Sequence, residues 1–229
     1  MITLRAWMRR LGSVVAAMVL LTGCAKVVAG TPTWPGERLE KALLTTADFP
    51  PGTGYGRIIE EPGQAGGAGG PAPMLSVPEG CSNGLTDVIA QSAENGRGSA
   101  AKYNVQYDGA RIVMTVSTWR LDIDQLAATA SRCEHFNAYF DRSSEGIPIT
   151  TTKLTAARPG QLLYQQTMQL HRTATSVFMS FENFDRMAVF GMAFPAMQLE
   201  PGAVAMPKAA LPETFIDVVN RQGDKVRAG

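Results

Sequence analysis

Histidine and cysteine are scarce in this chain. Its 229 residues include only two histidines, His135 and His171, and three cysteines. A zinc site needs three or four His, Cys or carboxylate ligands at suitable spacing, and a histidine that acts as a general base needs a positioned partner. Neither histidine has such neighbours in the sequence, so we predict two solvated surface histidines, no metal site and no cofactor.

Patterns typical of hydrolases and of nucleic-acid-binding proteins are also missing. No serine, including Ser131, Ser143 and Ser144, lies in a Gly-x-Ser-x-Gly motif. The 21 basic residues nearly balance the 20 acidic ones, and Lys and Arg form no cluster with interleaved aromatic residues. This composition argues against an electrostatic footprint for nucleic acid. We therefore expect a protein that is not an enzyme and has no nucleic-acid partner.

The N-terminal segment has the architecture of a secretory signal. Three arginines precede an apolar run, Leu11 to Leu20, that is shorter than the roughly 20 residues needed to span a bilayer. The run ends in Leu21-Thr22-Gly23-Cys24, which resembles the bacterial lipobox, where the cysteine is diacylglycerylated and the chain is cut just before it. We expect a signal peptide at 1–23 and a lipid anchor at Cys24, which would hold the protein on the extracytoplasmic face of the cell membrane. The alternatives are an ordinary secreted protein or an uncleaved anchor.

Composition divides the rest of the chain into three parts. Residues 24–36 are rich in proline and glycine and are expected to form a tether. Residues 37–79 are expected to contain a short helix followed by a disordered loop, because 62–73 has too few apolar side chains to offset the entropy of ordering. Residues 80–229 are expected to form one globular domain.

The two cysteines that remain after Cys24 are Cys81 and Cys133. An even pair in an exported domain favours a disulfide, which would stabilise the fold by roughly 4 kcal/mol in the chain-entropy model. The alternative is a pair of buried, reduced cysteines that pack as small hydrophobic residues.

Hydrophobic periodicity predicts a mixture of helices and strands. Asp108-Gly109 between two alternating runs is a strong hairpin signal. Helical spacing occurs in three segments, 81–94, 122–140 and 211–222, with Gly223 as the stop of the last. Strand patterns occur at 101–107, 112–117, 149–154, 162–170, 176–182 and 187–194. We predict an α+β fold: a single twisted antiparallel β-sheet with helices packed mainly on one face.

One face of the second hairpin strand is the candidate ligand site. Arg111, Val113, Thr115 and Trp119 would lie on its mixed face, where the large amphipathic tryptophan could form a groove wall. The alternative is that the C-terminal helix packs over this face and Trp119 belongs to the core. Asp122 and Asp124 are expected to cap the following helix and to compensate its dipole.

Several short motifs together resemble a known group of proteins. They are the lipobox, the Val-Ala-Gly-Thr tether, the segment Leu44-Thr45-Thr46-Ala47-Asp48-Phe49-Pro50-Pro51-Gly52, Pro78-Glu79-Gly80-Cys81, Ala101-Lys102-Tyr103-Asn104-Val105 and Ser131-Arg132-Cys133. The arrangement resembles mycobacterial lipoproteins related to the extracellular sensor domain of the receptor Ser/Thr kinase PknH. The resemblance implies an α+β domain with a central antiparallel sheet, a cleft and cysteine bridges. This chain lacks the second cysteine pair of the kinase sensor domain, and it is not expected to relay a binding event itself.

These observations favour a lipid-anchored cell-envelope protein with a non-catalytic, sensor-like domain that binds an unknown small or lipid-like ligand or an envelope protein. One alternative is an envelope enzyme acting on a cell-wall or lipid substrate, which a buried Ser/His/Asp cluster would favour. Another is a structural or adaptor lipoprotein without a cleft, which a flat polar sheet face would favour. An open pocket beside the candidate face would favour binding.

Overall fold

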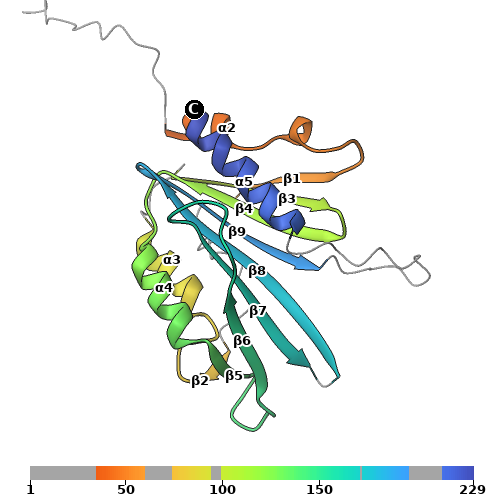
Figure 1. Cartoon of the computed structure of the whole chain (residues 1–229), viewed down its shortest axis with the longest axis vertical. Coiled ribbons are helices and arrows are strands. Elements are labelled where there is room, and N and C mark those ends of the chain that lie inside the picture. The colour runs from red at the N-terminus through yellow and green to blue at the C-terminus, as the bar shows by residue number, and fades with distance from the viewer. Residues whose placement is uncertain (1–34, 60–73, 94–98, 171, 196–212) are drawn as a thin grey trace, which may run out of the picture. The chain divides into compact units, whose positions relative to one another are not determined.

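The computed structural model describes residues 35–59, 74–93, 99–170, 172–195 and 213–229. These residues belong to one compact unit that extends from residue 33 to residue 229. In the described part, nine antiparallel strands form a single sheet and four α-helices pack against it (Figure 1). The α+β class and the single antiparallel sheet are therefore confirmed.

The sheet combines a hairpin with a run of consecutive strands. Across the sheet, the order is β1 (Gly54–Ile58), β3 (Ala100–Tyr107), β4 (Ala110–Ser117), β9 (Met187–Pro195), β8 (Thr173–Phe184), β7 (Leu162–Leu170), β6 (Ile147–Lys153), β5 (His135–Tyr139) and β2 (Leu75–Val77). The six predicted strands correspond to β3, β4, β6, β7, β8 and β9. The sequence did not predict β1, β2 or β5.

The β3–β4 hairpin forms where Asp108-Gly109 predicts it. Tyr107 pairs with Ala110, so the loop has two residues. Asp108 and Gly109 have φ values of 48° and 70°, and positive φ at both central positions is the requirement of the type I′ turns that favour this dipeptide. The alternating side chains of the hairpin then bury Val105 and Ile112 on the same face of the sheet.

Helices cover both faces of the sheet. On one face, α2 (Pro35–Ala42) and α5 (Glu213–Ala228) share a core cluster with Ile112 and Met114 of β4. On the other face, α3 (Gly84–Ser92) and α4 (Ile123–Arg132) pack in a second cluster that contains Phe181 and Phe190. The expectation that helices lie mainly on one face is therefore corrected. The physical reason is that the central strands carry apolar side chains on both sides, and both sides must be removed from water.

The folded unit begins before Gly80, the predicted domain start. Leu39 of α2 and Leu43, which directly follows that helix, are almost fully buried in the first cluster. A short 3₁₀-helix, η1 (Thr46–Asp48), follows, and β1 then pairs with β3. Residues 37–59 are therefore part of the domain rather than a segment outside it. The Gly/Pro-rich loop predicted at 62–73 lies outside the described residues.

Two predicted helix ends are corrected. The helix predicted over 122–140 ends at Arg132, and β5 begins at His135, so Phe140 lies 74% exposed instead of on the buried stripe. The C-terminal helix continues past Gly223, because this glycine serves packing and not termination. A Cβ atom at position 223 would lie only 2.8 Å from the ring of Phe184 and would also collide with the guanidinium of Arg158.

The guanidinium of Arg158 links α5 to the sheet through hydrogen bonds. Arg158 Nε donates to Glu182 Oε1 at 2.8 Å, and Arg158 Nη1 donates to the carbonyl oxygen of Asn220 on α5 at 3.2 Å. The carboxylate of Glu182 is only 6% exposed, and its hydrogen bonds raise the pKa of Arg158 above the ordinary value. A buried carboxylate requires a hydrogen-bonded cation of this kind.

Gln222 joins α5 to the N-terminal segment. Its side chain is fully buried; Nε2 donates to Ala42 O at 2.6 Å, and Oε1 accepts from Leu44 N at 3.1 Å. A single amide therefore satisfies two backbone groups at the end of α2. This contact explains how residues far apart in the sequence share one core.

Replacing Gln222 with Ala should lower the free energy of unfolding by about 2–4 kcal/mol, because two buried backbone groups lose their partners and a cavity opens. Urea unfolding followed by circular dichroism measures the change. Gln106→Ala, at an exposed position of β3, is the matched control and should change the value by less than about 0.5 kcal/mol. Equal unfolding free energies for the two variants would contradict the proposed role of Gln222.

Candidate ligand-binding site

The four residues predicted to bind a ligand do not surround one open groove. Arg111 is exposed, whereas Val113 is half-buried and Thr115 is buried beneath α3. Trp119 is 6% exposed, and its ring centroid lies 5.9 Å from that of Phe190 in the second core cluster. Trp119 is therefore a core residue, as the alternative had it, but α3 and α4 cover this face, whereas the C-terminal helix α5 packs on the other one.

The space beneath α3 is small. Val113 and Thr115 line a cavity of about 20 Å³ together with residues of α3 and of the central strands, namely Leu85, Thr86, Ile89, Met179, Phe181, Phe190, Gly191 and Met192. A volume of this size holds about one water molecule. The Met and Phe side chains of β8 and β9 therefore pack as core on this face and leave no room for a lipid chain.

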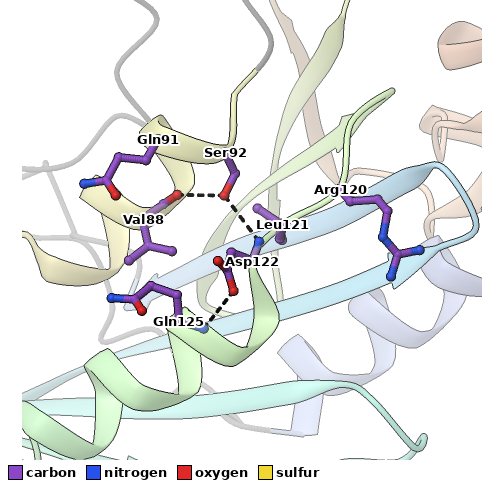
Figure 2. A pocket seen from close by; sticks show the side chains of 7 residues that line it. All are labelled: Val88, Gln91, Ser92, Arg120, Leu121, Asp122 and Gln125. Carbon is purple, nitrogen blue, oxygen red and sulfur yellow. Dashed lines mark hydrogen bonds between the residues drawn. The ribbon is translucent and has the colours of Figure 1, made fainter.

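A larger pocket lies where α3 ends and α4 begins. It is a depression open to solvent with a volume of about 430 Å³, which is comparable with the roughly 300–1,000 Å³ of small-molecule sites. Figure 2 shows the side chains that line it: Val88, Gln91 and Ser92 from α3, and Arg120, Leu121, Asp122 and Gln125 from the start of α4 and the loop before it. The pocket is our candidate functional site.

Hydrogen bonds hold the two helix ends in place. Asp122 caps α4, as predicted, because its Oδ1 accepts from Gln125 N at 2.9 Å. Ser92 Oγ donates to Val88 O at 2.9 Å and accepts from Asp122 N at 3.3 Å, so the last turn of α3 contacts the cap of α4. The pocket is thus bounded on both sides by helix termini whose backbone groups are engaged.

The loop before α4 is fixed from the sheet side. Asn183 of β8 binds Leu121 twice: its Oδ1 accepts from Leu121 N, and its Nδ2 donates to Leu121 O, both at 2.9 Å. Arg120 Nη1 donates to the carbonyl oxygen of Asp185 in the β8–β9 turn. These contacts hold the loop against β8, and the Arg120 side chain runs away from Asp122 and Gln125 toward the β8–β9 turn (Figure 2).

The pocket has an apolar floor and a polar rim. Val88 and Leu121 are both nearly buried, whereas Asp122 and Gln125 are exposed. Within the described part of the chain, the side-chain amides of Gln91 and Gln125 make no hydrogen bond. Arg120 and Asp122 carry opposite charges, so the rim combines donors and acceptors without a net charge. Sequence analysis singled out only Asp122 of this set, and only as a cap.

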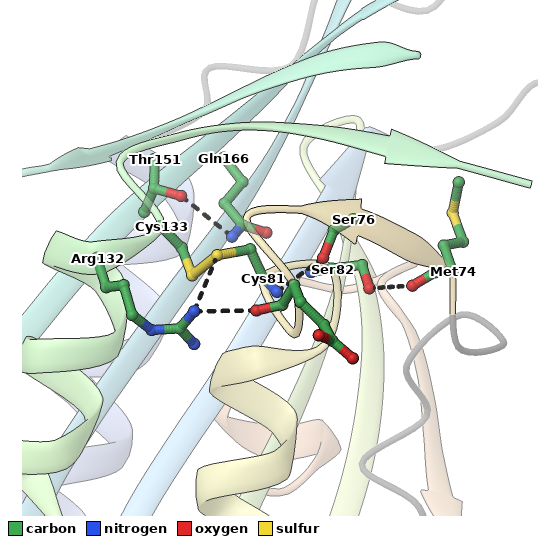
Figure 3. Close-up of a disulfide and its surroundings, with 9 residues drawn as sticks. Met74, Ser76, Cys81, Ser82, Arg132, Cys133, Thr151 and Gln166 are labelled. Carbon is green, nitrogen blue, oxygen red and sulfur yellow. Dashed lines mark hydrogen bonds between the residues drawn. A yellow bond between two sulfur atoms is a disulfide. The ribbon is translucent and has the colours of Figure 1, made fainter. Parts of the chain in front are cut away.

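The disulfide joins α3 and α4 at their other ends (Figure 3). Cys81 precedes α3 and Cys133 follows α4, which confirms the predicted pair. Both cysteines are buried; Cys81 N donates to Ser76 Oγ at 2.8 Å, and Arg132 Nη1 donates to Glu79 O at 3.0 Å. The two helices are therefore antiparallel, with a covalent link at one end and the pocket at the other.

Of the remaining sequence candidates, His135 is described by the structure and does not line the pocket. His135 is on β5 with a 72% exposed side chain, and its Nδ1 lies 3.4 Å from Thr150 Oγ1. It is therefore the surface histidine that was predicted, whereas His171 and Cys24 lie outside the described residues. Among the residues that the structure describes, no group of three or more His, Cys, Asp or Glu side chains is placed to hold a metal ion. None of the described helices has the length and hydropathy needed to cross a membrane.

The fold defines the class as an α+β protein built on a nine-stranded antiparallel sheet. The sequence matches no protein-family model and no curated protein. A solved structure with a similar fold is that of an uncharacterized protein from Mycobacterium smegmatis, the Rv0999 ortholog. The TM-score is 0.50 at 12% sequence identity, and the match covers 84% of this chain and 95% of the other. At this identity the comparison supports the fold alone.

The close packing of α3 on α4 can be tested at Gly84. A Cβ atom there would lie 2.8 Å from Thr129 Cγ2, and Thr129 is buried. Gly84→Ala should therefore lower the free energy of unfolding by about 1–2 kcal/mol, because overpacking outweighs the better helix propensity of alanine. Thr129→Ser removes the methyl group and should rescue Gly84→Ala. A double-mutant cycle by denaturant unfolding measures this coupling, and additive effects would contradict it.

Proposed function

We propose that the protein is a lipid-anchored lipoprotein of the cell envelope whose α+β domain binds a ligand, without catalysis, in the pocket between α3 and α4. The observation that carries the proposal is the pocket itself. Its volume is comparable with that of a small-molecule site, and two side-chain amides on its rim, those of Gln91 and Gln125, have no hydrogen-bond partner among the described residues. An apolar floor with a few converging polar groups is the common design of small-molecule sites.

The construction of the site supports binding. The disulfide, the Ser92–Asp122 contact and the two bonds from Asn183 hold the pocket walls in one arrangement. A site that is already formed before binding loses less conformational entropy when it takes its ligand. Hydrogen bonds require a defined geometry of donor and acceptor, and a rigid pocket wall holds its polar groups in such a geometry.

The second part of the proposal concerns the membrane anchor and the resemblance of the chain to known lipoproteins. The lipobox-like ending at Cys24 and the motifs shared with lipoproteins related to the PknH sensor domain support a membrane-tethered binding module. The mycobacterial source of the solved structure with a similar fold agrees with that resemblance. An acyl anchor contributes about 0.8 kcal/mol for each buried methylene group, and two or more chains on one cysteine hold a domain firmly at the bilayer.

Native mass spectrometry tests the binding function. The chain is purified in mild detergent from its own host and weighed under native conditions, then again after denaturation. We expect a reproducible extra mass that is lost on denaturation, because a preformed site should retain its ligand. A bare protein would weigh against a small molecule and favour an envelope protein as partner, and the denatured mass also reports the oxidation state of Cys81 and Cys133.

Detergent phase partition tests the anchor. The unmodified chain should enter the detergent phase with a mass at Cys24 that includes acyl groups. Cys24→Ser should leave the protein in the aqueous phase, because a serine cannot form the thioether to the diacylglyceryl group. A Cys81→Ser/Cys133→Ser variant keeps the lipobox and is the control, and should still partition into detergent. A wild-type chain that carries no acyl mass at Cys24 would rule out lipidation at this residue.

A further inference from the structure

We propose that the pocket between α3 and α4 binds a short saccharide, an uncharged ligand that presents several neighbouring hydroxyl groups. This inference rests on the proposed function, because it names the ligand class of the same site. Three properties of the pocket carry it: the balance of charge, the unused hydrogen-bonding capacity of the rim and the small apolar floor.

The charges at the rim favour a neutral ligand. Arg120 and Asp122 are the two charged residues among those that line the pocket, and they have opposite signs. A phosphate or carboxylate ligand would be repelled by the Asp122 carboxylate, and an ammonium ligand by the Arg120 guanidinium. Ligands with a net charge are bound by clusters of the opposite sign, and this rim has none.

The hydrogen-bonding groups at the rim match hydroxyl groups. The carboxylate of Asp122 uses one oxygen for the helix cap, and the guanidinium of Arg120 uses one donor group on Asp185. The side-chain amides of Gln91 and Gln125 each offer two N–H donors and one acceptor. A hydroxyl group both donates and accepts, so neighbouring hydroxyls can satisfy this mixed set, whereas a hydrocarbon chain would leave it unsatisfied.

The small apolar floor and the borders of the pocket favour a saccharide over a peptide as the ligand. Val88 and Leu121 are only 5% and 4% exposed, so the apolar contact that they offer is small and most of the contact with a ligand must come from the polar groups at the rim. An extended peptide is commonly recognised by adding a strand to a sheet edge, and a helical peptide by a long apolar groove. This pocket is bordered by two helix ends and a loop, and it offers neither.

The test uses the full chain on an array of immobilised saccharides with two pairs of variants. Asp122→Asn removes the charge but keeps a good N-cap residue. Asp124→Asn makes the same change two positions further along the chain, in the first turn of α4, at a residue that does not line the pocket. Gln125→Ala removes one rim amide on α4, and Gln106→Ala removes an exposed amide on β3. Matching thermal unfolding curves within each pair show that the fold is retained.

We expect the wild-type chain to bind a subset of the saccharides, with binding weakened about tenfold or more by Asp122→Asn and Gln125→Ala and unchanged by the two controls. Binding that all four variants retain would place the saccharide elsewhere and overturn the assignment of the pocket. If no saccharide binds but native mass spectrometry finds another bound molecule, the ligand class is wrong and the binding function stands. If neither experiment finds a ligand, both proposals fail.

Discussion

The central strands β4, β9 and β8 carry apolar side chains on both faces, and this constraint determines how the rest of the chain is arranged. Phe178 and Phe181 of β8 belong to clusters on opposite sides of the sheet. Burial of a phenylalanine side chain contributes about 1.5–3 kcal/mol, so neither face can stay in water without a large loss of stability. The N-terminal segment and α5 therefore cover one side, while α3 and α4 cover the other.

Helices α3 and α4 contribute both to the stability of the domain and to the candidate site. Their disulfide end is buried and close-packed, with Gly84 against Thr129. Their other end lies about 15 Å away along a helix of this length, and polar groups hold it through Ser92, Asp122 and Asn183. At this end, hydrogen bonds to backbone groups add to the apolar packing of Val88 and Leu121 in the second cluster. Polar side chains at the rim can then face water.

Features that depend on neighbouring residues were predictable from the sequence. The hairpin at Asp108-Gly109, the cap at Asp122 and six strands follow from local turn chemistry and periodicity, and the cysteine pair follows from the count of cysteines in an exported domain. The pocket was not predictable. Gln91 and Gln125 are ordinary exposed helix residues by pattern, and no periodicity brings them together, because their meeting depends on the antiparallel pairing of α3 with α4.

The sequence by itself determined the strands of the long alternating segments and the presence of the helices, but not where two of the helices end, because hydrophobic period and turn residues act over a few positions. It also determined the resemblance on which the expected lipid anchor rests. The tertiary structure decided which face each helix covers, where the domain begins and which side chains form a pocket. These outcomes arise from contacts between residues far apart in the chain, such as Gln222 with Ala42 and Cys81 with Cys133. Local sequence propensity carries no information about such pairs, because they form and stabilise the protein only when the tertiary structure forms.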